Sequence, residues 1–139
     1  MIKLSIIHPD LLQGLAQCGH KANILITDAN YSALTNVSPH ARIIYLNFSP
    51  GLINSGVILE KILDYINVEK ATLMISPVDF ENTIAREYHE ILPDNTAFDY
   101  VERNDFYTMA KSSDTLLVIT SGETRRFANI ILTVGPTLL

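Results

Sequence analysis

The sequence contains little cysteine, few positive charges and no long apolar run. Cys18 is the only cysteine, so an intramolecular disulfide is excluded. The formal net charge is −5 and no lysine and arginine cluster is present, which argues against nucleic acid and anionic membrane surfaces as partners. The most apolar stretch, residues 129–139, is far shorter than the roughly 20 residues of a membrane-spanning helix. Because no charged leader with a long apolar run opens the chain, we expect a cytoplasmic protein.

The usual motifs of metal-dependent and cofactor-dependent enzymes are also missing. None of the histidines at positions 8, 20, 40 and 89 has another His, Cys or carboxylate at a familiar metal-ligand spacing. The glycines do not follow the spacing of a dinucleotide-binding turn or a P-loop, and no Gly-x-Ser-x-Gly elbow is present. We therefore predict neither a metal site nor a cofactor.

The composition favours one compact domain that is unusually apolar. With 139 residues and no internal repeat or linker, the chain is predicted to form a single domain over residues 1–139. Hydrophobic residues make up 47% of the sequence and charged residues 18%, which is apolar for a small isolated monomer. This excess indicates contacts between subunits.

Short apolar runs with alternating periodicity predict the order of the secondary structure. A helix is expected to begin at His8-Pro9-Asp10 and to end at Gly19, with Cys18 buried inside it as a small hydrophobic residue. Further helices are predicted at 55–66, 79–92 and 105–111, and acidic residues near the start of 79–92 complement its dipole. Strands are predicted at 23–27, within 41–48, and at 71–75, 97–101, 115–120 and 130–134.

This alternation of strands and helices is typical of an α/β protein with a sheet flanked by helices. The link of residues 121–129 between the last two strands is too short for a crossover helix, so we expect those two strands to be antiparallel. The predicted fold is therefore a single-domain layered α/β fold with a mixed sheet.

Two residues flank the strand at 23–27 and each has two interpretations. His20 follows Gly19 just past the predicted helix end, where it either interacts with the helix dipole or reaches a pocket. Asp28 ends the strand, where it either forms a turn with nearby backbone N–H groups or provides a functional carboxylate. Together, an imidazole and a carboxylate are a plausible general acid and base.

Five segments of the sequence, taken in order, resemble the D-ribose pyranase / L-fucose mutarotase family. They are HPDLL at 8–12, CGH at 18–20, ILITDAN at 24–30, SGE at 121–123 and FANIIL at 127–132. Their joint occurrence in a chain of the family's typical length is far more specific than any one segment. Between them, only the pattern of strands and helices agrees.

The resemblance implies roles for six residues. His20 matches the proton-donating histidine, Asp28 a sugar-binding aspartate, and Phe127-Ala128-Asn129 the C-terminal sugar-binding segment. Arg103 matches a sugar-contacting position that is arginine in fucose-type members and histidine in ribose-type members, and thus favours a fucose-type protein.

Two positions depart from the family pattern. Phe127 stands where the family usually has tyrosine, so it lacks the hydroxyl but keeps an aromatic ring. Asn30 stands where fucose-type members commonly have histidine. These differences affect the identity of the sugar and leave His20 and Asp28 unaffected.

By resemblance, the chain is an isomerase of the mutarotase or pyranase type that acts on a free monosaccharide. Opening a cyclic hemiacetal needs only positioned proton donors and acceptors, so no metal or cofactor is required. The family also implies a homo-oligomer, commonly a decamer, with sugar sites between subunits. The alternatives are a ribose-type pyranase and a non-catalytic sugar-binding or transport-accessory protein, for which the loss of the hydroxyl at Phe127 is the argument.

Overall fold

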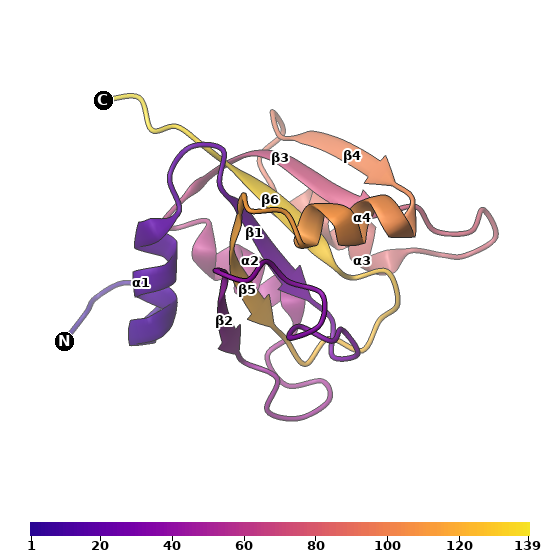
Figure 1. The fold of residues 1–139 in the computed structure, drawn as a ribbon, viewed down its shortest axis with the longest axis horizontal. Coiled ribbons are helices and arrows are strands. Elements are labelled where there is room, and N and C mark those ends of the chain that lie inside the picture. The colour runs from indigo at the N-terminus through magenta and orange to yellow at the C-terminus, as the bar shows by residue number, and fades with distance from the viewer.

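The computed structural model describes residues 1–139 as a six-stranded sheet flanked by four helices, as the sequence predicted (Figure 1). The helices are α1 (Pro9–Gln17), α2 (Ser55–Ile62), α3 (Thr83–Ile91) and α4 (Arg103–Ala110). The strands are β1 (Asn23–Thr27), β2 (Arg42–Tyr45), β3 (Asn67–Met74), β4 (Ala97–Val101), β5 (Thr115–Thr120) and β6 (Ile130–Gly135).

The sheet is mixed, with the strand order β2-β5-β1-β6-β3-β4. β6 is antiparallel to both of its neighbours, β1 and β3, while the other pairs of adjacent strands are parallel. The last two strands, β5 and β6, run in opposite directions as predicted, but they do not pair because β1 lies between them. The link of residues 121–129 therefore crosses the carboxyl end of β1.

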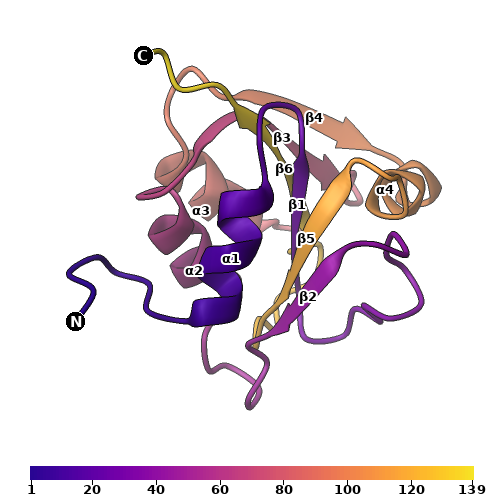
Figure 2. The same cartoon turned by 60° about the vertical axis from the view of Figure 1, so that its left-hand side comes forward.

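The two faces of the sheet are covered by different helices (Figure 2), and each carries its own apolar core. α1, α2 and α3 cover one face, where Ile24 and Ile26 of β1 join the larger core. α4 and the segment 31–41 cover the other face, where Leu25 packs with Phe106 and Val118. Because successive side chains of a strand point to opposite faces, β1 is buried along its whole length.

The first helix begins where the sequence predicted but ends at Gln17, before Cys18 and Gly19, and it has a cap at each end. His8 Nδ1 accepts a hydrogen bond from the Leu11 N–H at 3.2 Å, which satisfies a free donor of the first turn. Cys18 immediately follows α1 instead of lying inside it, and it is buried. Burial raises the pKa of the Cys18 thiol to about 11, so this thiol is inert at neutral pH.

The boundaries of several elements differ from the prediction, among them α4, which spans Arg103–Ala110 where a helix was predicted at 105–111. The helix predicted at 79–92 begins at Thr83, because the side chain of Asn82 caps it by accepting from the Ala85 N–H at 3.0 Å. Asp79 and Glu81 consequently precede the helix and are not in its first turn.

The helix predicted at 55–66 ends at Ile62, and β3 begins at Asn67, four residues before the predicted start. This part of β3 pairs with the end of β6, and such pairing between distant segments cannot be read from local periodicity. None of the four helices has the length and apolar character required to span a membrane.

Candidate functional site

A cavity of about 270 Å³ opens near the carboxyl end of β1 and the start of α4. Its lining comes from four separate parts of the chain: Asp28, Asn30, Tyr31, Met74, Arg103, Tyr107, Arg126, Phe127 and Asn129. Of the residues predicted from the sequence, the structure brings Asp28, Arg103, Phe127 and Asn129 together here. They are separated by up to about a hundred positions in the sequence.

Asp28 and Asn129 are connected directly. The Asp28 N–H donates to Asn129 Oδ1 at 2.8 Å, and Asp28 Oδ1 accepts from the Asn30 N–H at 2.9 Å. Asp28 therefore forms the predicted turn and also lines the cavity. Since Asn129 uses its carbonyl oxygen within the protein, its amide group remains a donor for a ligand.

The environment of Asp28 favours the protonated carboxyl more than water does. Burial raises its pKa, the backbone N–H groups of Asn30 and Tyr31 oppose this, and the negative charge of Glu123 raises the pKa further. The net effect is a raised pKa for Asp28. A carboxylate with a raised pKa accepts a proton more readily than the same group in water.

Aromatic rings form two parts of the cavity wall. The Phe127 ring packs edge-on against Phe80 with centroids 5.0 Å apart, and the Arg126 guanidinium lies 5.1 Å from the Phe127 centroid. Tyr31 and Tyr107 pack together with centroids 5.8 Å apart. The cavity thus combines apolar surfaces with a few polar groups, as is usual for small-molecule sites.

Sequence reasoning missed four lining residues, Tyr31, Met74, Tyr107 and Arg126. Tyr31 directly follows the Asp28-Ala29-Asn30 turn, and Tyr107 lies one helical turn after Arg103, so both positions carried a local signal. Arg126 precedes Phe127 and carried no signal that separates it from a solvent-exposed charge.

Arg103 is the first residue of α4, and its side chain has no carboxylate partner and no hydrogen bond within the protein. The same is true of Arg126. Their guanidinium groups are therefore available as donors to the oxygen atoms of a ligand.

Ala128 lies within the predicted binding segment but does not line the cavity. It is fully buried, and its carbonyl oxygen lies 2.6 Å from the Tyr88 hydroxyl. Its neighbours Phe127 and Asn129 face the cavity, so Ala128 contributes through its backbone.

His20 lies at the opposite end of β1 from this cavity. β1 has five residues at about 3.3 Å each, so about 16 Å of strand separates the two ends. The His20 side chain is 46% exposed, and its Nε2 lies 3.2 Å from Glu69 Oε2, while Glu69 also binds Lys21. Within one chain, the structure therefore does not bring His20 and Asp28 together as an acid and base pair.

The other histidines have local partners. His40 Nε2 lies 3.0 Å from the Ser113 carbonyl oxygen, and His89 Nε2 lies 2.7 Å from the Tyr100 hydroxyl. No group of three His, Cys, Asp or Glu side chains is arranged to hold a metal ion.

Comparisons with known proteins relate the whole chain to one family. The model of the RbsD / FucU transport protein family matches residues 1–137. D-ribose pyranase 2 of Streptomyces griseus subsp. griseus is 28% identical over 141 residues, which cover 97% of this chain and 98% of that protein.

Two solved structures with bound sugars have the same fold. RbsD of Bacillus subtilis, complexed with D-ribose, superposes with a TM-score of 0.85 at 25% identity over 99% of this chain and 100% of that chain. The fucose mutarotase of Streptococcus pneumoniae, in complex with L-fucose, superposes with a TM-score of 0.83, also at 25% identity and with the same coverage.

Proposed function

We propose, because this chain belongs to the RbsD / FucU transport protein family, that it is an isomerase that interconverts the cyclic forms of a free monosaccharide. The observation that carries the proposal is the cavity near the carboxyl end of β1, which joins Asp28, Arg103, Phe127 and Asn129. These four are among the five residues to which the family resemblance gives sugar-binding roles, and the fifth, Ala128, is buried behind the cavity wall.

The chemistry of the cavity suits the opening and closing of a sugar ring. Ring opening removes a proton from the anomeric hydroxyl and adds one to the ring oxygen, after which the aldehyde closes on either face. Asp28 can accept hydrogen bonds from sugar hydroxyls, while Asn129 and Arg103 can donate them. Positioned proton-transfer groups of this kind typically accelerate a reaction by about 10²–10⁴-fold, which suffices for a reaction that already proceeds in water.

The proton donor in this proposal is His20 of a neighbouring subunit. In one chain the cavity has no histidine, and His20 is exposed at the other end of β1. A ring of subunits in which His20 of one chain meets the cavity of the next completes the site. Exposed apolar side chains support such an assembly, among them Leu34 at 77% and Phe48 at 86% exposure.

We extend this proposal to a homodecamer, in the cytoplasm, with sugar sites between subunits. Light scattering tests the assembly directly, because a decamer has ten times the 15.5 kDa mass of the chain. A stable monomer with full activity would contradict shared sites.

Mixing two inactive variants tests whether His20 and Asp28 act across a subunit boundary. A co-assembled mixture of His20→Ala and Asp28→Asn chains should regain about a quarter of the wild-type sites, because one in four boundaries then joins an intact His20 to an intact Asp28. Each variant alone serves as the control. No recovery in a mixture that has co-assembled would contradict the proposal that His20 and Asp28 meet across a subunit boundary.

Arg103 favours L-fucose or a similar aldohexose as the sugar, with D-ribose as the alternative. Saturation-transfer NMR across free fucose-like and ribose-like sugars should show accelerated exchange between anomers or ring forms, with no change on addition of EDTA. The sugar with the largest acceleration identifies the substrate.

Phe127 supports a second candidate function, a sugar-binding or transport-accessory protein that retains the cavity without turnover. Measurable sugar binding with exchange equal to the protein-free control would favour this candidate. Binding to none of the sugars would contradict both.

A further inference from the structure

Phe127, which lines the cavity, has an unusual backbone conformation. Its φ angle is +62°, in the left-handed region that bulky residues rarely adopt. Such a conformation persists only where surrounding contacts hold it, and it often lies at a binding site. The contacts on both sides of Phe127 must therefore hold this conformation.

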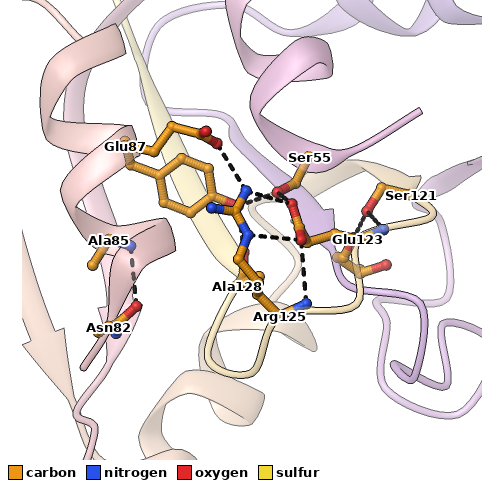
Figure 3. A network of polar contacts seen from close by, with 10 residues as sticks. Ser55, Asn82, Ala85, Glu87, Ser121, Glu123, Arg125 and Ala128 are labelled. Carbon is orange, nitrogen blue, oxygen red and sulfur yellow. Dashed lines mark hydrogen bonds and ion pairs between the residues drawn. The ribbon is translucent and has the colours of Figure 1, made fainter. Parts of the chain in front are cut away.

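A polar network around buried Glu123, here called the Glu123 network and drawn in Figure 3, contacts the chain on both sides of Phe127. It consists of Ser55, Tyr88, Glu123 and Arg125, and Glu87 binds Arg125 at its exposed edge. Two residues before Phe127, the Arg125 Nε and Nη2 atoms donate to the two Glu123 carboxylate oxygens, each at 3.0 Å. One residue after it, the Ala128 carbonyl oxygen lies 2.6 Å from the Tyr88 hydroxyl.

Glu123 is the centre of this network. Its side chain is only 2% exposed, and its carboxylate also accepts from the Ser55 hydroxyl at 3.1 Å and from the Arg125 N–H at 3.2 Å. Burial alone would raise the pKa of Glu123, but the hydrogen bonds and charge of Arg125 outweigh it and hold the pKa below its ordinary value. The carboxylate is therefore charged at neutral pH.

The same loop is bonded to the other half of the sugar site. The Glu123 carbonyl oxygen accepts from the Ala29 N–H at 2.8 Å, and the Ser121 hydroxyl donates to the Thr27 carbonyl oxygen. These bonds lie on both sides of Asp28. Glu123 thus joins the turn that carries Asp28 to the segment that carries Phe127 and Asn129.

We infer that Glu123 is a positioning residue of the sugar site. Its carboxylate holds Arg125, and with Tyr88 this keeps Phe127 in the left-handed conformation that turns its ring and the Asn129 amide towards the cavity. The inference rests on the proposed function for its kinetic test, whereas a second test below requires no sugar.

Three variants separate positioning from a merely structural role. Glu123→Gln removes the charge at the centre of the network. Glu87→Gln is the matched control, because Glu87 binds the same arginine at 3.0 Å but is 40% exposed and lies at the edge of the network. Asn82→Ala removes the cap of α3, the helix that carries Tyr88, and so destabilises the same region without touching the Glu123 network.

The kinetic measurement is the exchange of L-fucose and D-ribose by saturation-transfer NMR. Glu123→Gln should raise KM by about ten- to hundredfold, the value of a charged hydrogen bond, and change kcat much less, because the proton donor is unaltered. Glu87→Gln and Asn82→Ala should leave KM near the wild-type value. An unchanged KM in Glu123→Gln would overturn the inference, as would an equal rise in Asn82→Ala.

The second measurement is limited trypsin digestion of the sugar-free protein, with cleavage after Arg125 and Arg126 identified by peptide mass. Glu123→Gln should speed this cleavage by about ten- to hundredfold, because the loop opens more often. Glu87→Gln should change it little. Equal rates in wild type and Glu123→Gln would overturn the inference.

These readouts keep the two proposals apart. If wild-type exchange is absent, the isomerase proposal fails, and the sugar dissociation constant from calorimetry replaces KM in testing Glu123. If Glu123→Gln does not fold, Glu123→Asp keeps the charge on a shorter side chain, and the same rise in KM and in cleavage is expected.

Discussion

The two ends of β1 differ in how complete their chemistry is within a single chain. At the carboxyl end, Asp28 is half-buried, bonded to Asn129 and enclosed in a cavity. At the amino end, His20 is 46% exposed, and its one polar partner is Glu69. Under the proposed function, a single chain assembles the sugar-binding half of the site, while the proton-donating half becomes functional only against another subunit.

The largest effect is expected at the amino end. His20→Ala should slow sugar exchange by about 10²–10⁴-fold, the usual contribution of a positioned acid or base, with sugar affinity changed little. Saturation-transfer NMR measures exchange and calorimetry measures affinity, and His40→Ala provides a control at another exposed histidine. Full exchange by a folded His20→Ala protein would mean that His20 is not the proton donor and only interacts with the dipole of α1.

At the carboxyl end, Asp28→Asn should act mainly on binding. The loss of a charged acceptor should weaken sugar affinity by about ten- to hundredfold, because hydrogen bonds to charged groups are worth about 1.5–3 kcal/mol. Calorimetric titration with the preferred sugar checks this. An affinity equal to that of the wild type would mean that Asp28 only forms the turn with Asn30.

Phe127→Tyr adds the hydroxyl that the family usually has at this position. A net hydrogen bond is worth about 0.5–1.5 kcal/mol, so sugar affinity should rise by about two- to tenfold, to an extent that depends on the sugar. Unchanged affinity and exchange for every sugar would show that the side chain does not reach the ligand. Conversion of an inert protein into an active one would favour the sugar-binding candidate for the wild type.

A smaller effect is expected for Glu69, the partner of His20 at the amino end. The hydrogen bond from Lys21 and the contact with His20 lower the pKa of Glu69, so it is charged at neutral pH. Glu69→Gln should reduce exchange by only about two- to fivefold, because exposed ion pairs are weak. The pH profile of exchange should shift with it, and an identical profile would mean that Glu69 does not act on His20.

The smallest effect concerns stability. Since burial raises the pKa of Asp28 in the folded state, ionisation of Asp28 disfavours folding as the pH rises from its ordinary value of 3.8 through the folded pKa. Asp28→Asn should therefore melt slightly higher than the wild type at pH 7, and this difference should vanish below about pH 3.8. Thermal unfolding at both pH values measures it, and a lower melting temperature at pH 7 would contradict it.

Local patterns in the sequence determined much of the fold. Period-2 and period-3.6 runs of apolar residues predicted the four helices and six strands, because each pattern reports which side of an element is buried. The position of Asp28 at the end of a strand, together with the order of the five similar segments, predicted that Asp28, Phe127 and Asn129 belong to the site, and the family position of Arg103 predicted a fourth residue that lines the cavity. The sequence also showed that Phe127 stands where the family usually has tyrosine.

Only the tertiary structure decided how these elements meet. Periodicity does not report which strands are neighbours, so the insertion of β1 between β5 and β6 was not predictable, nor was the passage of residues 121–129 over its end. That passage brings Glu123 and Phe127 to Asp28. His20 likewise lies beyond the amino end of β1, opposite to Asp28. A strand extends by about 3.3 Å per residue and cannot bring its two ends together.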